Sequence, residues 1–423
     1  MSTGTSAAAP PLTQNPVLSR AVRRRRLAFY GPAFVAAVAY VDPGNFATNF
    51  QAGARHGYLL VWVLVSACAV AMFIQYLSAK TGLATGRDLP TLCRDSFRRP
   101  VVVGLWAQAE VVAMATDLAE FVGAAIGLYL LFGVPMLPAA LITAVVSFAI
   151  LALQRRGYRP FELAIVFLLG IIALGFAYTL VAAGGQSASG LAAGMTPAFH
   201  GTDSVVLAIG IIGATVMPHV IYLHSALTAQ RQAPEGPAER KRALRTLRVD
   251  TTLGLSLAGL INLSMLCVAA AVFHGAAGDF DGSLGSAHQG FDRLVGGGAA
   301  LAFAAALLAS GLSSSGVGTY SGQVIMEGFL RMRIPLFLRR AITMAPALVV
   351  LALGMSPDKV LLASQVVLSF GIPFALIPLV LISRRRDLMG ELVNRPVTTF
   401  VGWVAALLIS GINIYLLQQV FFG

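Results

Sequence analysis

Charged residues are scarce in this chain: Asp, Glu, Lys and Arg make up 11% of the 423 residues, whereas 57% are hydrophobic. A soluble domain carries about 25% charged residues. The mean hydropathy of +0.78 therefore excludes an ordinary water-soluble protein. Apolar runs of about 20 residues recur along nearly the whole length, and each is long enough to cross a hydrocarbon core as a helix. Because the short alternating segments of membrane strands are absent, we predict an all-α integral membrane protein.

Cysteines are also few. The three, Cys68, Cys93 and Cys267, are scattered along the chain and form neither a disulfide framework nor a metal-thiolate spacing. Residues 1–22 are rich in Ala, Pro, Ser and Thr and lack the apolar segment of a signal peptide, so we expect a disordered cytoplasmic tail. No polar connection is long enough to hold a core of its own. Residues 23–423 are therefore expected to form a single transmembrane domain.

The apolar runs predict eleven membrane spans, and the two longest are expected to tilt or to project into water. The spans cover residues 27–52, 58–80, 102–132, 135–154, 160–184, 203–230, 250–274, 297–328, 335–354, 358–383 and 396–420.

Lys and Arg lie almost entirely on alternate connections between these spans. Of the 30 basic residues, all but Arg55, Arg293 and Lys359 fall on one side of the predicted membrane. This positive-inside pattern predicts a cytoplasmic N-terminus and, with an odd number of spans, a C-terminus outside. The formal charge of +12 therefore reports topology, and a nucleic-acid partner is not expected.

Two of the predicted spans are interrupted near their middle. The first contains AYVDPGN at 39–45, and the sixth contains GATVMPHV at 213–220. Their prolines, Pro43 and Pro218, are separated by a five-span period, so the second unit enters the membrane inverted relative to the first. Paired broken helices in inverted halves are typical of secondary transporters with a binding site at the midplane. The expected parts are repeat one at about 27–184, repeat two at about 203–383 and an extra helix at about 396–420.

The first break carries groups that a simple helix kink does not need. An Asp at the centre of a bilayer costs about 2.5–3.5 kcal/mol, and such residues face a cavity, a partner or an ion. If the helix opens at Pro43 and Gly44, the freed carbonyls and the oxygens of Asp42 and Asn45 form a compact set of donors for a cation.

The second break is more ambiguous, because Pro218 alone is explained equally well by a kink in a packed helix. Met217 adds a thioether, although Met in an apolar span usually serves packing, and an unwound turn near Ala214 would expose carbonyls. Sulfur beside a carboxylate and an amide favours a first-row divalent metal ion over Mg²⁺ or Ca²⁺.

Both breaks resemble the motifs of one family. DPGN at 42–45 and MPHVIYLHSAL at 217–227 closely resemble the Nramp (natural resistance-associated macrophage protein) family of proton-coupled manganese and iron transporters. The resemblance covers essentially the whole chain. GLSSSGVGTYSGQ at 311–323 is similar to the family's Ser-, Thr- and Gly-rich segment, with Leu312 and Val220 as departures from the usual pattern. The resemblance implies a LeuT-type 5+5 inverted repeat of about 11 transmembrane helices, with helices 1 and 6 discontinuous.

The resemblance also implies a ligand set and a substrate. Mn²⁺ or Fe²⁺, and also Cd²⁺ or Co²⁺, would be transported with H⁺ as co-substrate, and no cofactor would be permanently bound. The metal ligands would be Asp42, Asn45, the Ala214 carbonyl, Met217 and Gln365. The residues expected to act in gating or to support these ligands are Pro43, Gly44, Pro218 and His224.

Proton coupling needs groups that change charge as the site fills. Asp42 and His219 are the candidates at the site, since His titrates near neutral pH. The third predicted span adds Glu110, Asp117 and Glu120, which occupy one helix face at 100° per residue.

The three acids have two possible roles. They either conduct protons or lock helices together by pairing with Arg231, Arg339 and Arg340. The residues alone favour neither role over the other. The resemblance favours a proton relay that includes Asp117, Glu120 and Arg340.

Together these patterns predict a proton-coupled symporter of the bacterial plasma (inner) membrane that imports divalent transition metal ions by alternating access. The alternatives are a Mg²⁺ or organic-substrate symporter on the same fold, or a metal-permeable channel. An enzyme is not expected, because nothing resembles a nucleophile and base pair, a phosphate-binding loop or a multi-His catalytic site. The expected partners are the metal ions, protons and the lipid bilayer, with no obligate protein partner evident.

Overall fold

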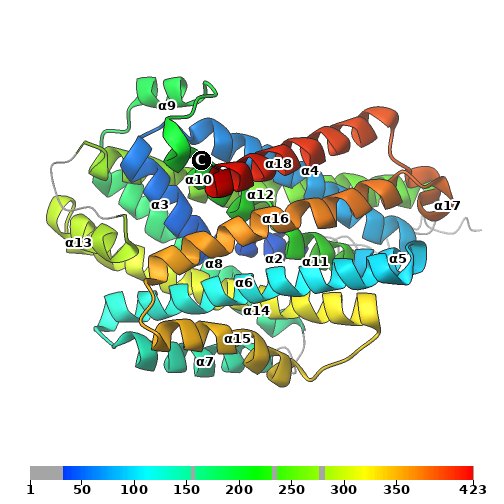
Figure 1. Ribbon diagram of the computed structural model, residues 1–423, viewed down its shortest axis with the longest axis horizontal. Helices are drawn as coiled ribbons and strands as arrows, with labels where there is room; N and C mark the ends of the chain where they lie inside the picture. The colour runs from blue at the N-terminus through cyan, green and yellow to red at the C-terminus, as the bar shows by residue number, and fades with distance from the viewer. Residues whose placement is uncertain (1–31, 154–157, 231–235, 276–281, 423) are drawn as a thin grey trace, which may run out of the picture.

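Every regular element that the computed structural model describes is a helix (Figure 1). It describes residues 32–153, 158–230, 236–275 and 282–422, so the predicted tail at 1–22 lies outside the described residues. In chain order the helices are α2 (Pro32–Ala39), α3 (Pro43–His56), α4 (Val61–Thr85), α5 (Leu89–Ser96), α6 (Arg99–Phe132), α7 (Met136–Leu153), α8 (Tyr158–Ala183), α9 (Ala188–Gly194), α10 (Gly201–Thr215), α11 (Pro218–Ala229), α12 (Pro237–Phe273), α13 (Leu284–Leu294), α14 (Gly297–Leu330), α15 (Leu336–Ala352), α16 (Pro357–Ser383), α17 (Arg386–Met389), the 3-10 helix η3 (Gly390–Leu392) and α18 (Pro396–Phe422).

Each of the eleven predicted spans coincides with a helix or with a pair of half-helices. Among the described residues, eight segments are long and apolar enough to cross a membrane, and α10 and α11 together form one of them. The other three predicted spans are the pair α2 and α3, and the shorter helices α7 and α15. The prediction of an all-α membrane protein is confirmed.

One predicted boundary differs clearly from the structure. The seventh span was expected to begin at residue 250, but α12 begins at Pro237 and is 37 residues long. The additional turns are rich in Ala, Glu, Arg, Lys and Leu, which are strong helix formers, and proline is favoured at the first helical position. The apolar pattern marks only the part of this helix that is hydrophobic, so the polar extension escaped it.

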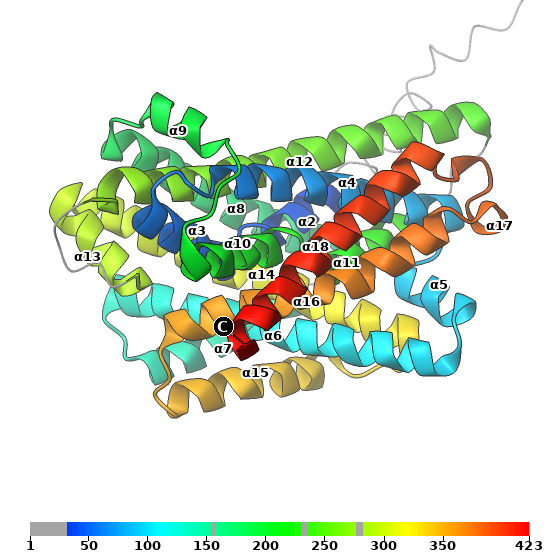
Figure 2. The ribbon, with the colours of Figure 1, turned by 45° about the horizontal axis from the view of Figure 1, so that its top comes forward.

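The helices cross the molecule from one end to the other. In Figure 1, α5 and α17 mark one end and α9 and α13 mark the opposite end; we call these the α5 end and the α13 end. The broken helices lie side by side in the middle and run in opposite directions: α2 and α3 lead toward the α13 end, whereas α10 and α11 lead toward the α5 end (Figure 2). This antiparallel pair agrees with the inverted arrangement predicted from Pro43 and Pro218.

The long helices α6 and α14 pack against each other along the core, and small residues permit their close approach. A Cβ atom on Gly127 would lie 2.7 Å from the backbone nitrogen of Leu308. A Cβ on Gly311 would lie 2.7 Å from the backbone nitrogen of Ala124 and from the Glu120 carbonyl oxygen. The two backbones are therefore too close at these points for any side chain, which fixes how α6 presents its acids to α14.

This close packing predicts that Gly127→Ala destabilises the protein. Small-to-large changes at such contacts cost about 1–3 kcal/mol, so the midpoint of thermal unfolding in detergent should fall by several degrees. The control is Gly104→Ala on the same helix, because a Cβ there would have nothing within 4 Å. Equal midpoints for the two variants would show that α6 and α14 do not pack as described.

Candidate metal site at the two helix breaks

The first break separates α2 from α3. Residues Tyr40 to Asp42 leave the helical path, and α3 restarts at Pro43 with Asp42 as its N-cap. The Asp42 Oδ1 atom accepts hydrogen bonds from the Asn45 backbone nitrogen at 2.9 Å and from Asn45 Nδ2 at 2.7 Å. Proline suits the first position of a helix, where its missing N–H has no partner to lose. The DPGN sequence thus restarts the helix and holds the Asp42 carboxylate at the gap.

The second break has the same construction. The helix α10 ends at Thr215, Val216 has φ −104° and ψ 71°, and α11 restarts at Pro218 with Met217 as its N-cap. Both breaks therefore place the carbonyl end of one half-helix next to the amide end of another. The carbonyl end carries partial negative charge, which suits a cation.

One hydrogen bond joins the two breaks. Asn45 Nδ2 donates to the carbonyl oxygen of Ala214 at 3.0 Å. The helix α16 closes the other side: a Cβ on Gly44 would lie 2.1 Å from Gln365 Nε2, and a Cβ on Gly213 would lie 1.9 Å from the Gln365 carbonyl oxygen. Gln365 therefore lies directly against both breaks, and Asn45 and Ala214 belong to a single site.

The donor set has oxygen atoms that lack hydrogen-bond partners. Within the described part of the chain, Asp42 Oδ2, Asn45 Oδ1 and Gln365 Oε1 are buried and accept no hydrogen bond. The whole proposed ligand set is shielded from solvent: Asp42, Asn45, Ala214, Met217 and Gln365 are each 0% exposed. Buried acceptors without donors are costly unless they meet a cation. The residues present therefore fit a transported metal ion.

Other polar groups freed by the first break are satisfied by neighbouring helices. Asn262 Nδ2 of α12 donates to the Tyr40 carbonyl at 2.7 Å, and Ser310 Oγ of α14 donates to the Val41 carbonyl at 2.6 Å. The carbonyls freed by the first break thus have donors, whereas one side-chain oxygen on each of Asp42, Asn45 and Gln365 does not. No group of three or more His, Cys, Asp and Glu residues occurs among the residues described, so a metal would need this mixed set.

Two of the three acids on α6 pair with arginine. Asp117 Oδ1 accepts from Arg340 Nη1 at 3.2 Å, and this nitrogen also donates to the Thr319 hydroxyl at 2.6 Å. Glu110 receives two hydrogen bonds from Arg339, at 3.2 and 2.9 Å. Both pairs cross from α6 to α15. These two acids therefore join helices by pairing with arginine, which was the alternative to conducting protons.

Glu120 differs from the other two acids. It is 1% exposed, and its Oε2 atom has no hydrogen-bond partner among the described residues. A Cβ on Gly318 would lie 2.8 Å from Glu120 Oε2 and 3.1 Å from Asp117 Oδ1, so both carboxylates meet α14 at the same glycine. The third expected partner, Arg231, lies outside the described residues.

The two histidines of α11 contact different helices, because at 100° per residue a five-residue spacing puts them on opposite sides of the helix. His219 Nδ1 lies 3.2 Å from the Thr116 hydroxyl of α6, one residue before Asp117. His224 Nδ1 lies 3.0 Å from Gln75 Oε1, and Gln75 Nε2 donates to the Tyr40 hydroxyl at 2.7 Å. His219 therefore connects α11 to α6 at Thr116, and His224 connects α11 to the first break.

Sequence reasoning missed several residues of this network. Gln75, Thr116, Asn262 and Ser310 contact the site residues or support them. All four are polar positions within predicted spans, and that polarity was the available signal. Which partner each one meets depends on helix packing, which the local pattern does not contain.

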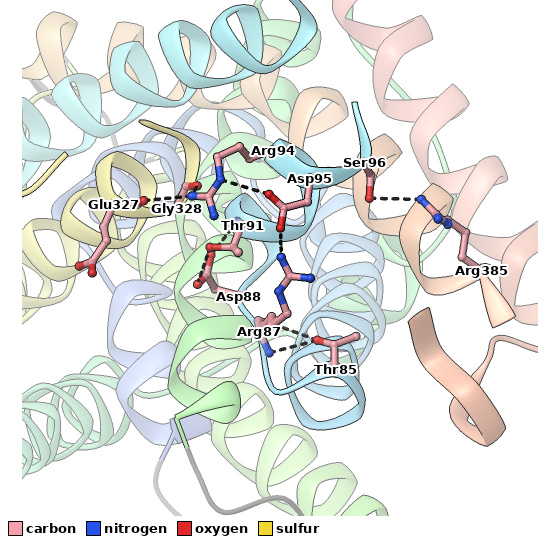
Figure 3. A network of polar contacts seen from close by, with 10 residues as sticks. All are labelled: Thr85, Arg87, Asp88, Thr91, Arg94, Asp95, Ser96, Glu327, Gly328 and Arg385. Atoms are coloured by element: carbon pink, nitrogen blue, oxygen red, sulfur yellow. Dashed lines mark hydrogen bonds and ion pairs between the residues drawn. The ribbon is translucent and has the colours of Figure 1, made fainter. Parts of the chain in front are cut away.

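A polar network closes the α5 end (Figure 3). Arg94 donates to the carbonyl oxygens of Glu327 and Gly328 at the end of α14, and the Leu89 amide donates to Ser225 Oγ of α11 at 2.9 Å. A cavity of about 430 Å³ lies among α5, α11 and α14. Cys93 of α5 is buried, which raises the pKa of its thiol, and all three cysteines are free as predicted. Contacts between α5, α11 and α14 therefore hold these three helices together at the α5 end.

Comparison with known proteins gives a consistent result. The family described as natural resistance-associated macrophage protein-like (Nramp) matches residues 33–419. A protein of Deinococcus radiodurans named divalent metal cation transporter MntH is 53% identical, covering 95% of this chain and 92% of that protein. The protein of the same name from Bacillus subtilis is 52% identical, covering 94% and 93%.

Solved structures agree with these relatives. The crystal structure of a manganese transporter of Eremococcus coleocola has a TM-score of 0.85 at 32% identity and covers 94% of this chain and 87% of that one. The nucleobase-cation-symport-1 family transporter Mhp1 has a TM-score of 0.63 at 15% identity, covering 93% and 94%, and shows similarity of fold alone.

The buried ion pair between Asp117 and Arg340 predicts a larger loss of thermal stability on mutation than an exposed pair does. Arg340→Met leaves the Asp117 carboxylate, 4% exposed, without its arginine. Breaking a buried pair in this way costs about 3–5 kcal/mol, so the thermal midpoint and the half-life at elevated temperature should both fall.

The control is Asp387→Asn, which removes the pair with Arg385 at the α5 end, where both side chains are exposed. Exposed pairs contribute little, so this variant should behave like the unmodified protein. The double change Asp117→Asn with Arg340→Met should recover part of the loss. Equal stability of Arg340→Met and Asp387→Asn would contradict the buried pair.

Proposed function

Since the chain belongs to the natural resistance-associated macrophage protein-like (Nramp) family, we propose that this divalent metal cation transporter imports Mn²⁺ together with H⁺ by alternating access. Fe²⁺, Cd²⁺ and Co²⁺ are further substrates in this proposal. The protein is a transporter and not an enzyme. Three buried oxygens without described donors, on Asp42, Asn45 and Gln365, carry the proposal, because they lie at the junction of the two broken helices.

In this proposal the metal is held by Asp42, Asn45, the Ala214 carbonyl and Met217, with Gln365 approaching from α16. One carboxylate and neutral oxygens suit many divalent ions, so discrimination falls to the thioether. Mg²⁺ and Ca²⁺ prefer oxygen ligands, whereas Mn²⁺ and Fe²⁺ tolerate softer donors. Met217 thereby disfavours the two abundant competitors.

The orientation in the membrane follows from the placement of the basic residues. Those in the described connections lie at the α5 end, except Arg55, Arg293 and Lys359, which belong to the α13 end. The positive-inside rule then places the α5 end and the N-terminus in the cytoplasm and the C-terminus outside. Repeat one would span about 27–184 and repeat two about 203–383, with an extra helix at about 396–420.

Proton coupling is assigned to the groups that connect the site to α6. Asp42 and His219 lie at the breaks, and the Thr116 contact leads from His219 to the helix that carries Glu120 and Asp117. Glu120 is the acid of α6 without an arginine partner among the described residues, so it is free to exchange a proton. We propose that Glu120 takes up the proton and that Arg340, Arg339 and Glu110 set the charge along the rest of the path.

Alternating access requires the buried site to open at one end at a time. Pro43, Gly44 and Pro218 sit where the half-helices restart, so the half-helices α2 and α11 can tilt without breaking regular hydrogen bonds. The link from His224 through Gln75 to Tyr40 joins those two half-helices. Opening toward the α5 end would separate this link and the contacts of α5.

The direct test is Mn²⁺ influx into proteoliposomes that contain the purified protein, with a pH-sensitive dye inside and excess Ca²⁺ outside. We expect saturable influx that resists Ca²⁺ and acidifies the lumen. Asp42→Ala should abolish both signals, because it removes the only carboxylate of the ligand set. Asp203→Ala, which removes an exposed acid at the α13 end, serves as the control and should retain both.

Each outcome of this test has a definite meaning. Normal Mn²⁺ uptake by Asp42→Ala would refute the proposed site. Influx without acidification would retain the metal site and remove the proton role of His219 and Glu120. Unsaturable influx would indicate a channel.

Met217→Ala tests the basis of selectivity. We expect Ca²⁺ and Mg²⁺ to inhibit Mn²⁺ uptake about tenfold more strongly in this variant, since the remaining ligands are all oxygen. Met265→Ala, at another fully buried methionine in α12, controls for the loss of packing. An unchanged competition profile for Met217→Ala would exclude sulfur ligation.

A further inference from the structure

A second cavity lies away from the metal site, between α4 and the polar extension of α12. It has a volume of about 600 Å³. Tyr76 of α4 lines it on one side, and none of the lining residues is acidic. The lining residues from α12 are Ala238, Lys241, Arg242, Leu244, Arg245 and Arg248. The proposed transport mechanism uses none of these side chains. We call this cavity the basic pocket.

The four cations of the basic pocket lie close together on the polar extension of α12, whose single acid, Glu239, does not line the pocket. Each is exposed, and none takes part in an ion pair with another described residue. Elsewhere at this end exposed arginines do find acids, as Arg87 does with Asp95. The described partner of Arg248 is an aromatic ring: its guanidinium carbon lies 5.3 Å from the centroid of Tyr76. The basic pocket is therefore a concentrated, uncompensated positive site suited to an anion.

The depth of the pocket places it at the surface of a membrane. At 1.5 Å per residue, the 37 residues of α12 extend about 55 Å. A hydrocarbon core is about 30 Å thick, so the first several turns of α12 lie at the level of the lipid headgroups or beyond them. Ala243 and Leu247 pack against Ala79 and Leu83 of α4, which holds this extension against the protein.

The same face of α12 becomes apolar directly below the cations. Val249, Leu253 and Leu260 are 40%, 56% and 64% exposed. At 100° per residue, these three and Arg245 fall within an arc of about 80°. One continuous surface thus offers positive charge at headgroup depth and exposed hydrocarbon below it. An amphiphile with an anionic head and acyl chains matches both parts, whereas a soluble anion matches only the first.

We propose that the basic pocket binds the phosphate of an anionic phospholipid, with the acyl chains lying along Val249, Leu253 and Leu260. The lipid belongs to the leaflet at the α5 end, which is the cytoplasmic leaflet in the orientation proposed above. The positive-inside rule explains why basic residues gather at this end. It does not require four of them to line one pocket over a tyrosine ring. The chain's own first 26 residues contain five arginines and no acid, so they are not charge-complementary to the pocket.

The position of the pocket connects it to the moving parts of the transporter. Tyr76 follows Gln75, which bonds to the Tyr40 hydroxyl at the first break. Asp250, two residues after Arg248, accepts a hydrogen bond from the Ala33 amide of α2 at 3.2 Å. A lipid held by Tyr76 and Arg248 therefore steadies α12, against which α2 packs, and α4, which bonds to Tyr40 at the first break.

The test is lipid binding by the full-length protein in detergent, measured by native mass spectrometry. Phosphatidylglycerol is compared with phosphatidylcholine of the same acyl chains, and glycerol 3-phosphate is added as a soluble competitor. We expect preferential retention of phosphatidylglycerol that glycerol 3-phosphate does not displace. Lys241→Gln, Arg245→Gln and Arg248→Gln combined should weaken this retention about tenfold or more.

The matched control removes the same charge from other places. Arg98→Gln, Arg384→Gln and Arg386→Gln combined change three exposed arginines at the α5 end that do not line the pocket. This control should retain phosphatidylglycerol as the unmodified protein does. Equal losses in both triple variants would indicate non-specific attraction and overturn the proposal. Displacement by glycerol 3-phosphate would assign the pocket to a soluble anion and overturn it as well.

The test distinguishes a loss of lipid binding from a failure to fold and from a loss of metal transport. The single variant Arg245→Gln, at one exposed position, should show a smaller loss in the same direction, so a triple variant that fails to fold does not decide the outcome. Binding is measured without any metal ion, and therefore neither the loss of Mn²⁺ transport nor its presence alters the interpretation. Undiminished retention by both Arg245→Gln and the pocket triple variant would refute the lipid site.

Discussion

The hydrogen bond from Asn45 to the Ala214 carbonyl connects two helices that are both interrupted in the middle of a membrane protein. Each interruption exposes polar backbone where no water is available, which is tolerated only if other groups satisfy it. Asn262 and Ser310 satisfy the carbonyls of Tyr40 and Val41, whereas Asp42, Asn45 and Gln365 each keep one side-chain oxygen without a described donor. The same constraint that makes the breaks costly thus creates an attraction for a cation and couples the two halves of the fold.

The surrounding helices maintain this arrangement by close packing. Glycines on α6 and α14 bring the two backbones into contact, and this contact sets where Asp117 and Glu120 lie relative to α14. Arg340 and Arg339 then neutralise Asp117 and Glu110 and hold α15 against α6. The packing therefore divides three similar acids into two that pair with arginine and one, Glu120, that has no arginine ion pair among the described residues, which is why we propose it as the proton carrier.

Charge at the α5 end has more than one consequence. Arg94 anchors α5 to the end of α14, while Arg248 lies over the ring of Tyr76. Basic residues at this end thus contribute both to contacts between α5 and α14 and to the basic pocket that we propose as a lipid site. Both lie near α4, which also carries Gln75. Under the two proposals made above, the closed end would respond to the membrane lipid as well as to the transported metal.

Much of this was determined by the sequence itself. Runs of apolar residues predict the spans, and Pro43 and Pro218 predict the breaks, because proline cannot continue a helix and cannot donate a backbone hydrogen bond. Asp42, Asn45 and Met217 were identifiable because such residues are unexpected beside those prolines. The tertiary structure alone decided that Asn45 meets Ala214, that Gln75 joins Tyr40 to His224, and that Asp117 pairs while Glu120 does not. It also decided that α12 extends beyond its apolar part. These outcomes depend on contacts between residues distant in the chain, and hydrophobic periodicity records only which residues are buried, not which neighbours they meet.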